Sequence, residues 1–433
     1  MRESGSNITF YPLSLGCVKN QTDFEYLAGA LSRYNWSMTE DPSSADVIII
    51  NTCSFIEDAR EESIEEIFTF VSEKPVIVTG CLFQRYPGIA EEIPEVRIFA
   101  GIEPARFAGD IDRAFRNNEA VSLIESDTVY CEQESRKPFS RYHTYIKISE
   151  GCDRRCSFCA IPSIRGKYRS RETDNIIEEV RHLYSEGFRE FNLISEDTSL
   201  YSSDSSKTDI TGLIRKLNDI GLEDIWFRLL YVYPGHNIED IVQAIADSEH
   251  FINYIDVPFQ HVSNRILKLM NRIPVDVQGI SRMIKDKGLT LRSTLMTGFP
   301  TETEEEFNAM ADFVSQSNID KLGLFRYCDE ENTPAEQLDE KIDNDIKNRR
   351  LEILLDIQEE NAYSNMMKNK GRIIKAIFHE KAGDRYIGRL LEDMYETDEL
   401  LLSRSEGIVL HRPVDIMITD IDNMAYIGIL KGE

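Results

Sequence analysis

The sequence contains no apolar run that approaches the ~20 residues a membrane-spanning helix needs. Its longest candidate is the short stretch at residues 47–50. The first seven residues also lack the apolar core of a secretory signal peptide. We therefore expect neither membrane insertion nor export, and we predict a cytoplasmic protein whose cysteines are thiols for metal binding or catalysis rather than disulfides.

Basic residues are scarce relative to acidic ones. The 433-residue chain has 49 Lys and Arg against 76 Asp and Glu, a formal net charge of −27. A surface of this sign repels nucleic-acid phosphates and attracts basic proteins, so nucleic acid is not expected as the direct substrate. Many soluble bacterial proteins are equally acidic, and the charge alone excludes little. The seven histidines show no H-x-H or H-E-x-x-H spacing, which gives a mononuclear metalloenzyme no support.

Short β-rich runs alternate with helical patterns near the start of the chain. Continuous apolar runs such as 47–50 are typical of parallel strands buried on both faces. The periodicity predicts a helix after the first strand, with Asn20 as its cap. The expected strands are 8–13, 47–50 and 76–78. We predict a parallel α/β sheet domain over residues 1–130, followed by an irregular linker at 131–140.

The alternation restarts after the linker, over residues 141–370. Six strand–helix units followed by a long helix at 344–368 predict a partial (β/α)₆ TIM-like barrel, with its chemistry at the C-terminal strand ends. The expected strands are 144–148, 190–194, 226–232, 254–257, 289–296 and 322–327. Residues 371–433 instead show about five short strands, which predict a small antiparallel β-barrel of OB-like size. That segment has eight Lys and Arg against twelve Asp and Glu, a net charge of −4.

Three cysteines form a C-x₃-C-x₂-C motif directly after a predicted strand: Cys152, Cys156 and Cys159. Three thiolates on one loop can hold a [4Fe–4S] cluster and leave one iron open for a substrate or cofactor. Zinc is the alternative, but a structural zinc site has four ligands. The fourth ligand would then have to come from His143 or Cys131.

Three further cysteines, Cys17, Cys53 and Cys81, each follow the C-terminal end of one predicted N-terminal strand. Such ends converge at one edge of a parallel sheet, so we expect these thiols to lie together and to hold a second cluster. The alternative is three buried cysteines that act as small apolar residues. Cys131 and Cys328 have no partner in this scheme and are expected to be bystanders.

The C-x₃-C-x₂-C motif, with Phe158 before its third cysteine, resembles that of the radical S-adenosylmethionine (SAM) superfamily. The resemblance implies that this motif holds a [4Fe–4S] cluster whose open iron binds SAM, and that the reduced cluster cleaves SAM to a radical. Together with the N-terminal cysteines and the C-terminal barrel, the whole chain resembles the methylthiotransferase family. In that family the barrel is called TRAM and a second [4Fe–4S] cluster carries the sulfur that is methylated. An electron donor such as flavodoxin or ferredoxin is implied.

Local segments favour the RimO-type branch of that family, which methylthiolates the β-carbon of an aspartate in small-subunit ribosomal protein twelve. These segments are LGCVKN at 15–20, CAIPSIRGK at 159–167, SEDTSLY at 195–201, DVPFQH at 256–261, GFPTETE at 298–304 and NTPA at 332–335. Val18 and Glu196 replace the branch's usual proline and glutamine. The expected partner is that basic ribosomal protein, free or in the ribosomal particle, which an acidic barrel would attract. The alternatives are a MiaB-like enzyme for a tRNA adenosine and a non-catalytic zinc or iron–sulfur scaffold.

The same resemblance implies SAM contacts, most of them at the ends of the predicted barrel strands. They are Phe158, Ser195, Glu196, Asp197, Arg228, Thr297 and Gly298. A glycine at 298 is expected to let the backbone approach adenine. No catalytic residue is assigned beyond the clusters. Residues 152–171 also carry six Lys and Arg against one Asp, which predicts either a solvated loop or cations that favour cluster thiolates.

Overall fold

The structure is a computed structural model that describes residues 6–124, 136–203, 207–317, 319–395 and 398–432. Its contacts divide the chain into two compact units. The first unit is Met1–Asp209 with Cys328–Gln337, and the second is Ile210–Tyr327 with Leu338–Glu433. The division into domains 1–130, 141–370 and 371–433 stays a prediction. Within the described ranges, no helix is both long enough and apolar enough to cross a membrane.

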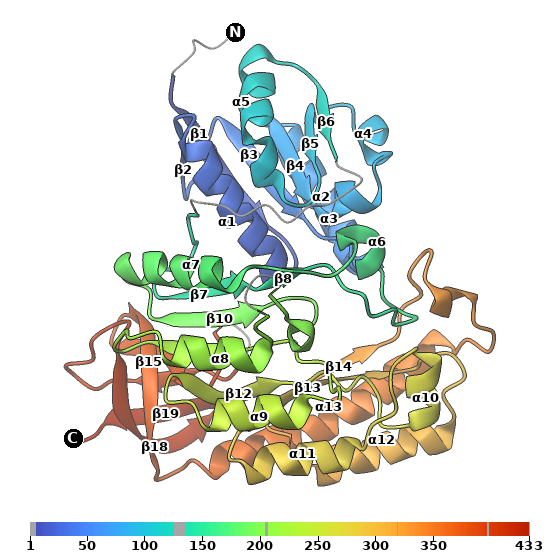
Figure 1. Ribbon diagram of the computed structural model, residues 1–433, viewed down its shortest axis with the longest axis vertical. Coiled ribbons are helices and arrows are strands. Elements are labelled where there is room, and N and C mark those ends of the chain that lie inside the picture. The colour runs from blue at the N-terminus through green and yellow to red at the C-terminus, as the bar shows by residue number, and fades with distance from the viewer. Residues whose placement is uncertain (1–5, 125–135, 204–206, 318, 396–397, 433) are drawn as a thin grey trace. The chain divides into compact units, whose positions relative to one another are not determined.

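A six-stranded parallel sheet forms the N-terminal part of the first unit, in the order β2-β1-β3-β4-β5-β6 (Figure 1). The predicted strands are confirmed as β1, β3 and β4, whereas the other three strands have three residues each and were not predicted. The strands are β1 Ile8–Ser14, β2 Trp36–Met38, β3 Val47–Thr52, β4 Val76–Gly80, β5 Ile98–Ala100 and β6 Val121–Leu123.

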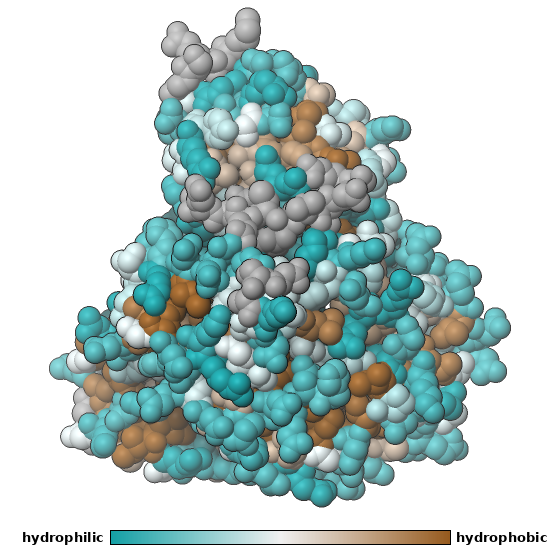
Figure 2. Space-filling model, viewed as in Figure 1, coloured by the Kyte–Doolittle hydropathy of each residue, from teal (hydrophilic) through white to brown (hydrophobic). Residues whose placement is uncertain are grey.

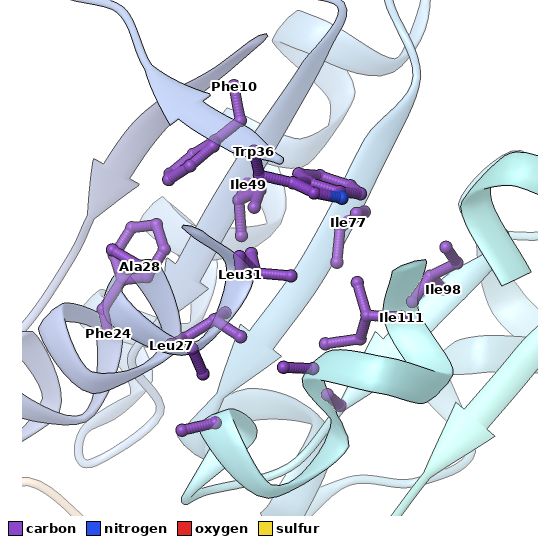
Figure 3. Packing of buried hydrophobic residues seen from close by; sticks show 14 of the residues in the cluster. Phe10, Phe24, Leu27, Ala28, Leu31, Trp36, Ile49, Ile77, Ile98 and Ile111 are labelled. Atoms are coloured by element: carbon purple, nitrogen blue, oxygen red, sulfur yellow. The ribbon is translucent and has the colours of Figure 1, made fainter. Parts of the chain in front are cut away.

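Buried apolar clusters lie on both faces of this sheet. Figure 3 shows Leu27 and Leu31 of α1 and Ile111 of α5 packed in one cluster with Ile49 and Ile77 of the sheet. The other cluster gathers side chains of α2, α3 and α4. These helices are α1 Val18–Ser32, α2 Glu57–Val71, α3 Cys81–Arg85, α4 Ile89–Glu92 and α5 Ala108–Asn117.

The rest of the first unit contains the parallel pair β7 and β10 and the short antiparallel pair β8 and β9. The elements are β7 His143–Lys147, β8 Ser149–Glu150, α6 Ile161–Arg165, β9 Arg169–Ser170, α7 Thr173–Ser185 and β10 Glu190–Ile194. The cysteine motif at 152–159 therefore follows β8 and leads directly into α6.

The second unit begins with four parallel strands, β11 to β14, each paired with the next along the chain. With β7 and β10 they account for all six predicted barrel strands. The elements are α8 Ile210–Asn218, β11 Trp226–Leu229, α9 Ile238–Ala246, β12 Phe251–Asp256, α10 Asn264–Leu269, α11 Val277–Asp286, β13 Thr290–Thr297, α12 Glu304–Gln316, β14 Lys321–Arg326 and α13 Asn344–Met367.

A closed barrel of five strands ends the chain, in the order β15-β16-β17-β19-β18. Its neighbours pair antiparallel except β17 and β19, which are parallel. The strands are β15 Ile373–Ala382, β16 Arg385–Leu390, β17 Leu401–Ser403, β18 Pro413–Asp422 and β19 Ala425–Leu430. The predicted fold class, parallel α/β sheets followed by a small β-barrel, is confirmed. On the face shown in Figure 2, hydrophilic residues dominate and hydrophobic ones form small scattered groups.

Candidate functional site

Cys17, Cys53 and Cys81, here called the first triad, follow three adjacent strands. In the parallel register of β3 and β4, Thr52 lies opposite Gly80, so Cys53 and Cys81 leave the sheet side by side. Gly16 has φ +87°, and a Cβ added there would lie 2.7 Å from the Cβ of Cys53 and 2.8 Å from its Sγ. Only glycine permits this approach. The loop with Cys17 therefore lies directly against Cys53.

One buried amide joins the three loops of the first triad. The side chain of Asn20 donates to the carbonyl oxygens of Leu15 at 3.1 Å and Thr52 at 2.9 Å. Its Oδ1 lies 3.9 Å from the Sγ of Cys81. The prediction that Asn20 caps a helix is wrong, because α1 begins two residues earlier with Cys17 at its N-cap position. Asn20 instead ties the loop before α1 to the end of β3.

Cys152, Cys156 and Cys159, here called the second triad, lie on one tight loop. Gly151 has φ +73°, and a Cβ there would meet the carbonyl oxygen of Lys167 at 2.3 Å. The backbone N–H of Cys159 donates to the carbonyl of Cys156 at 3.1 Å, which turns the loop back on itself. The geometry of this triad is therefore set mainly by local backbone contacts.

A stretch of the first unit that lies late in the sequence contacts the loops of both triads. The N–H of Ala335 donates to the carbonyl oxygen of Ser157, inside the second triad, at 2.8 Å. Glu330 pairs with Arg85 at 3.1 Å, and the two side chains are only 8% and 7% exposed. Arg85 also donates to the carbonyl of Ser54, beside the first triad, at 2.6 Å. Sequence reasoning missed this connection, because it joins residues about 250 positions apart.

The chemistry of both triads suits a thiolate-bound cluster. All six thiols are free of disulfides. Burial raises the pKa of Cys53, and it raises the pKa of Cys81, Cys152 and Cys159 to about 12 in each case. Within each triad the charges of the neighbouring thiols raise these pKa values further. Cluster binding would displace the protons.

Among the described residues, no group of three or more His, Cys, Asp and Glu side chains is placed to hold a single metal ion. A four-iron cluster is a larger group held by cysteine thiolates, which is the donor set that each triad offers. Three thiols in each triad, none consumed by a disulfide, therefore fit such a cluster. His143, considered as a fourth zinc ligand, lies within hydrogen-bond distance of the hydroxyl of Ser140, at 2.9 Å.

Four buried charges lie between the triads. Arg165, at the end of α6, donates to Asp23 at 3.0 Å and to Glu150 at 2.8 Å. Lys147 pairs with the same two acids, and all four side chains are at most 3% exposed. Burial opposes ionisation of Glu150, but the charges of Arg165 and Lys147 outweigh it and lower its pKa to about 2. Sequence reasoning missed Asp23, Lys147 and Glu150, because isolated charges in a sequence usually indicate surface positions.

The predicted SAM contacts after β10 differ in how their polar atoms are used. Ser195 accepts the N–H of Asp197 at 3.0 Å, and Asp197 pairs with Arg154 at 2.9 Å. The side chain of Glu196 is 4% exposed, and neither of its oxygens has a hydrogen-bond partner. Burial, followed by the charge of Glu150, raises the pKa of Glu196 to about 7. A buried carboxyl with unused acceptors is suited to an ammonium group such as that of SAM.

Three predicted SAM contacts lie in the second unit. Arg228 is buried and donates to the carbonyl oxygens of Leu391 and Asp393, each at 3.0 Å. These contacts hold the turn after β16 of the terminal barrel. A role for Arg228 toward SAM stays a prediction.

Thr297 and Gly298 share a buried acid, Glu302. The hydroxyl of Thr297 lies 3.1 Å from one oxygen of Glu302, and the N–H of Gly298 lies 2.9 Å from the other. Gly298 has φ +76°, and a Cβ there would lie 2.5 Å from the Cγ of Lys347. The structure therefore requires glycine at this position for its backbone conformation and for the packing of Lys347, apart from any contact with adenine.

The predicted basic stretch at 152–171 is only partly a surface feature. Arg165 and Arg171 are 1% and 3% exposed and engage buried acids, so the solvated-loop interpretation is wrong for these two. Phe158 is half-buried. Cys328 is half-buried in the first unit, and Cys131 lies outside the described residues.

Residues 146–314 match the model of the radical SAM superfamily, and residues 9–101 match the model of the uncharacterized protein family UPF0004. The ribosomal protein uS12 methylthiotransferase RimO of Clostridium novyi is 37% identical over 97% of this chain and 98% of its own length. The RimO protein of Thermotoga maritima is 38% identical over 91% of this chain and 93% of its own. This chain belongs to the RimO family.

Solved radical SAM enzymes share the fold of this RimO-family chain. The SAM methyltransferase TsrM from Kitasatospora setae, solved with cobalamin and a [4Fe–4S] cluster, matches with a TM-score of 0.56 at 14% identity, over 76% of this chain and 74% of its own. The cobalamin-dependent SAM radical enzyme OxsB matches with a TM-score of 0.52 at 14% identity, over 81% and 56%. At this identity the likeness concerns the fold alone.

Each of the two family models covers one cysteine triad of this RimO-family protein. The radical SAM match spans the second triad, and the UPF0004 match spans the first. The predicted resemblance to the radical SAM superfamily and to the RimO-type branch is confirmed. The chain belongs to the family even though Val18 and Glu196 differ from the residues usual in that branch.

Proposed function

We propose that this protein is a radical SAM methylthiotransferase that adds a methylthio group to the β-carbon of an aspartate in ribosomal protein uS12. The observation that carries the proposal is the presence of two triads of cysteines, none of them in a disulfide, in one compact unit of a RimO-family chain. The second triad would hold the [4Fe–4S] cluster that binds SAM. The first would hold a second cluster that carries the sulfur.

The chain's own residues would bind and shield these groups. SAM bound at the reduced cluster supplies a radical that removes hydrogen from carbon. Glu196 would accept hydrogen bonds from the ammonium of SAM through its two oxygens, neither of which has a hydrogen-bond partner. Ser195, Asp197 and Phe158 would complete the cofactor contacts on this unit. Burial of Cys53 and Cys81 would keep water from the sulfur-bearing site.

The proposed partners follow from charge and from the redox step. Ribosomal protein uS12, free or in the small-subunit particle, would be attracted to a chain of net charge −27, and its docking would use the barrel of net charge −4. A flavodoxin or ferredoxin would supply electrons, and the reaction would take place in the cytoplasm. Arg228, Thr297 and Gly298 of the second unit remain proposed SAM contacts.

The test is to delete the gene in its host and to weigh the intact small-subunit proteins, with nucleoside analysis of total tRNA alongside. We expect uS12 alone to lose the mass of a methylthio group. The parent gene should restore this mass, whereas a Cys156→Ala copy should not. Disappearance of a methylthioadenosine from tRNA, with uS12 unchanged, would replace the protein substrate by a tRNA adenosine. No change in either would overturn the proposed function.

A further inference from the structure

The three nitrogens of the Arg165 guanidinium face four different residues. Its Nη1 donates to the buried acids Asp23 and Glu150. Its Nη2 lies 3.8 Å from the Sγ of Cys81, and its Nε lies 3.6 Å from Glu196. The side chain is 1% exposed, and all of these residues belong to the first unit. One side chain therefore contacts the first triad and the carboxyl that follows β10.

The acids determine how this guanidinium is oriented. The planar fork of an arginine can bind carboxylates on one side while its other nitrogens face elsewhere, which the single ammonium of a lysine cannot do. Arginine stays protonated in proteins, and the ion pairs with Glu150 and Asp23 compensate for the burial of this side chain. The positive charge beside Cys81 is therefore permanent.

We propose that Arg165 is a positioning residue that fixes this charge against the Cys81 side of the first triad and tunes the cluster bound there. The inference rests on the proposed function, in which the first triad holds a [4Fe–4S] cluster. A nearby cation stabilises the state that carries more negative charge. When the cluster gains one electron from a reductant its charge becomes more negative, so Arg165 raises its reduction potential.

The experiment isolates the first triad in the full-length chain. Cys152, Cys156 and Cys159 are replaced by alanine, the protein is reconstituted anaerobically with ferrous iron and sulfide, and the cluster is titrated with dithionite and mediators under electron paramagnetic resonance. Arg165→Gln and Arg165→Lys are compared with Arg171→Gln and Arg171→Lys. Arg171 is an equally buried arginine of the same unit that pairs with Glu179, and it is not among the main charges that act on Cys81.

At the potential where half of the parent cluster is reduced, Arg165→Gln should lower the ratio of reduced to oxidised cluster by about tenfold. Arg165→Lys should lower it less, by about threefold, because it keeps the charge but not the fork. The Arg171 variants should match the parent. If Arg165→Gln does not fold, the comparison of Arg165→Lys with Arg171→Lys tests the proposal.

The experiment distinguishes failure of the proposed second cluster from failure of the proposed role of Arg165. Absence of iron and sulfide from the isolated first triad, in the parent background, would overturn the second cluster of the proposed function. A cluster that assembles there with the same potential in the Arg165 and Arg171 variants would leave that function standing and overturn the role of Arg165.

Discussion

Each triad offers three thiols, but the fold brings the three together in a different way in each case. The second triad lies within the eight residues 152–159, and its loop is shaped by nearby backbone hydrogen bonds. The first triad draws on three loops between residues 17 and 81, and its geometry depends on strand register and on the amide of Asn20. The comparison teaches that one site is encoded locally and the other by tertiary structure. Damage to the sheet should therefore affect the first triad alone.

Replacing the cysteines has the largest expected effect. Alanine at Cys152, Cys156 or Cys159 removes a thiolate from the proposed SAM-binding cluster and should abolish SAM cleavage, measured as release of 5′-deoxyadenosine. Alanine at Cys17 or Cys53 should leave cleavage in place and abolish methylthiolation of uS12, measured by mass. Cleavage that survives in the first set, or methylthiolation in the second, would contradict the assignment of that triad.

Two glycines allow the same comparison of the triads without replacing any proposed cluster ligand. Gly16→Ala places a methyl group against Cys53, and Gly151→Ala places one against the Lys167 carbonyl. Each should lower the iron content by about half, since each disturbs one of two proposed four-iron clusters. Only Gly151→Ala should also lose SAM cleavage. Gly187→Ala is the matched control, because Gly187 has φ +108° but no atom within 4 Å of an added Cβ.

Asn20→Asp should weaken only the first triad. The carboxylate has the same shape but cannot donate to the carbonyl oxygens of Leu15 and Thr52. The free energy of unfolding in urea should fall by about 2–3 kcal/mol, since two buried acceptors lose their donor. The iron content should fall with SAM cleavage retained. Asn7→Asp, at an exposed asparagine of the same unit, is the control for the added charge, and an equal loss there would remove the special role of Asn20.

The smallest expected effect concerns Glu103, which follows β5 in the sheet of the first triad. Burial, followed by the charge of Glu150, raises its pKa from 4.5 to about 7. The folded state therefore retains the proton that the unfolded chain releases, and the free energy of unfolding falls as pH rises from about 4.5 to 7. Glu103→Gln should be more stable than the parent by about 2 kcal/mol at pH 8 and equal to it at pH 4. Thermal unfolding at both pH values tests this, with exposed Glu95→Gln as the control.

Much of the first triad could be predicted from the sequence, because apolar runs of four and three residues mark β3 and β4 and a cysteine follows each strand. The strands β2, β5 and β6 could not, since three residues show no reliable alternation. Asn20 was interpreted as a helix cap from its place before apolar residues. Its actual partners, Leu15 and Thr52, become neighbours only when the sheet forms.

The residues between the triads were hidden for a different reason. Three of them lie on different elements: Asp23 on α1, Lys147 on β7 and Glu150 on β8. Residues of these types are usually exposed to solvent. Their burial is energetically tolerable only because they pair with one another and with Arg165. A pattern along one element cannot reveal such pairing. The Arg85–Glu330 pair was hidden in the same way by its long separation in sequence.

The hydrogen bond from Ala335 to Ser157 also has a consequence for biosynthesis. When the ribosome has released the chain as far as Cys159, all six thiols are already present, yet the donor that closes the second loop has still to be translated. The first triad's loops can form on the emerging sheet, whereas the second triad gains its last backbone contact some 175 residues later. The direction of translation therefore sets when the second triad can gain this contact.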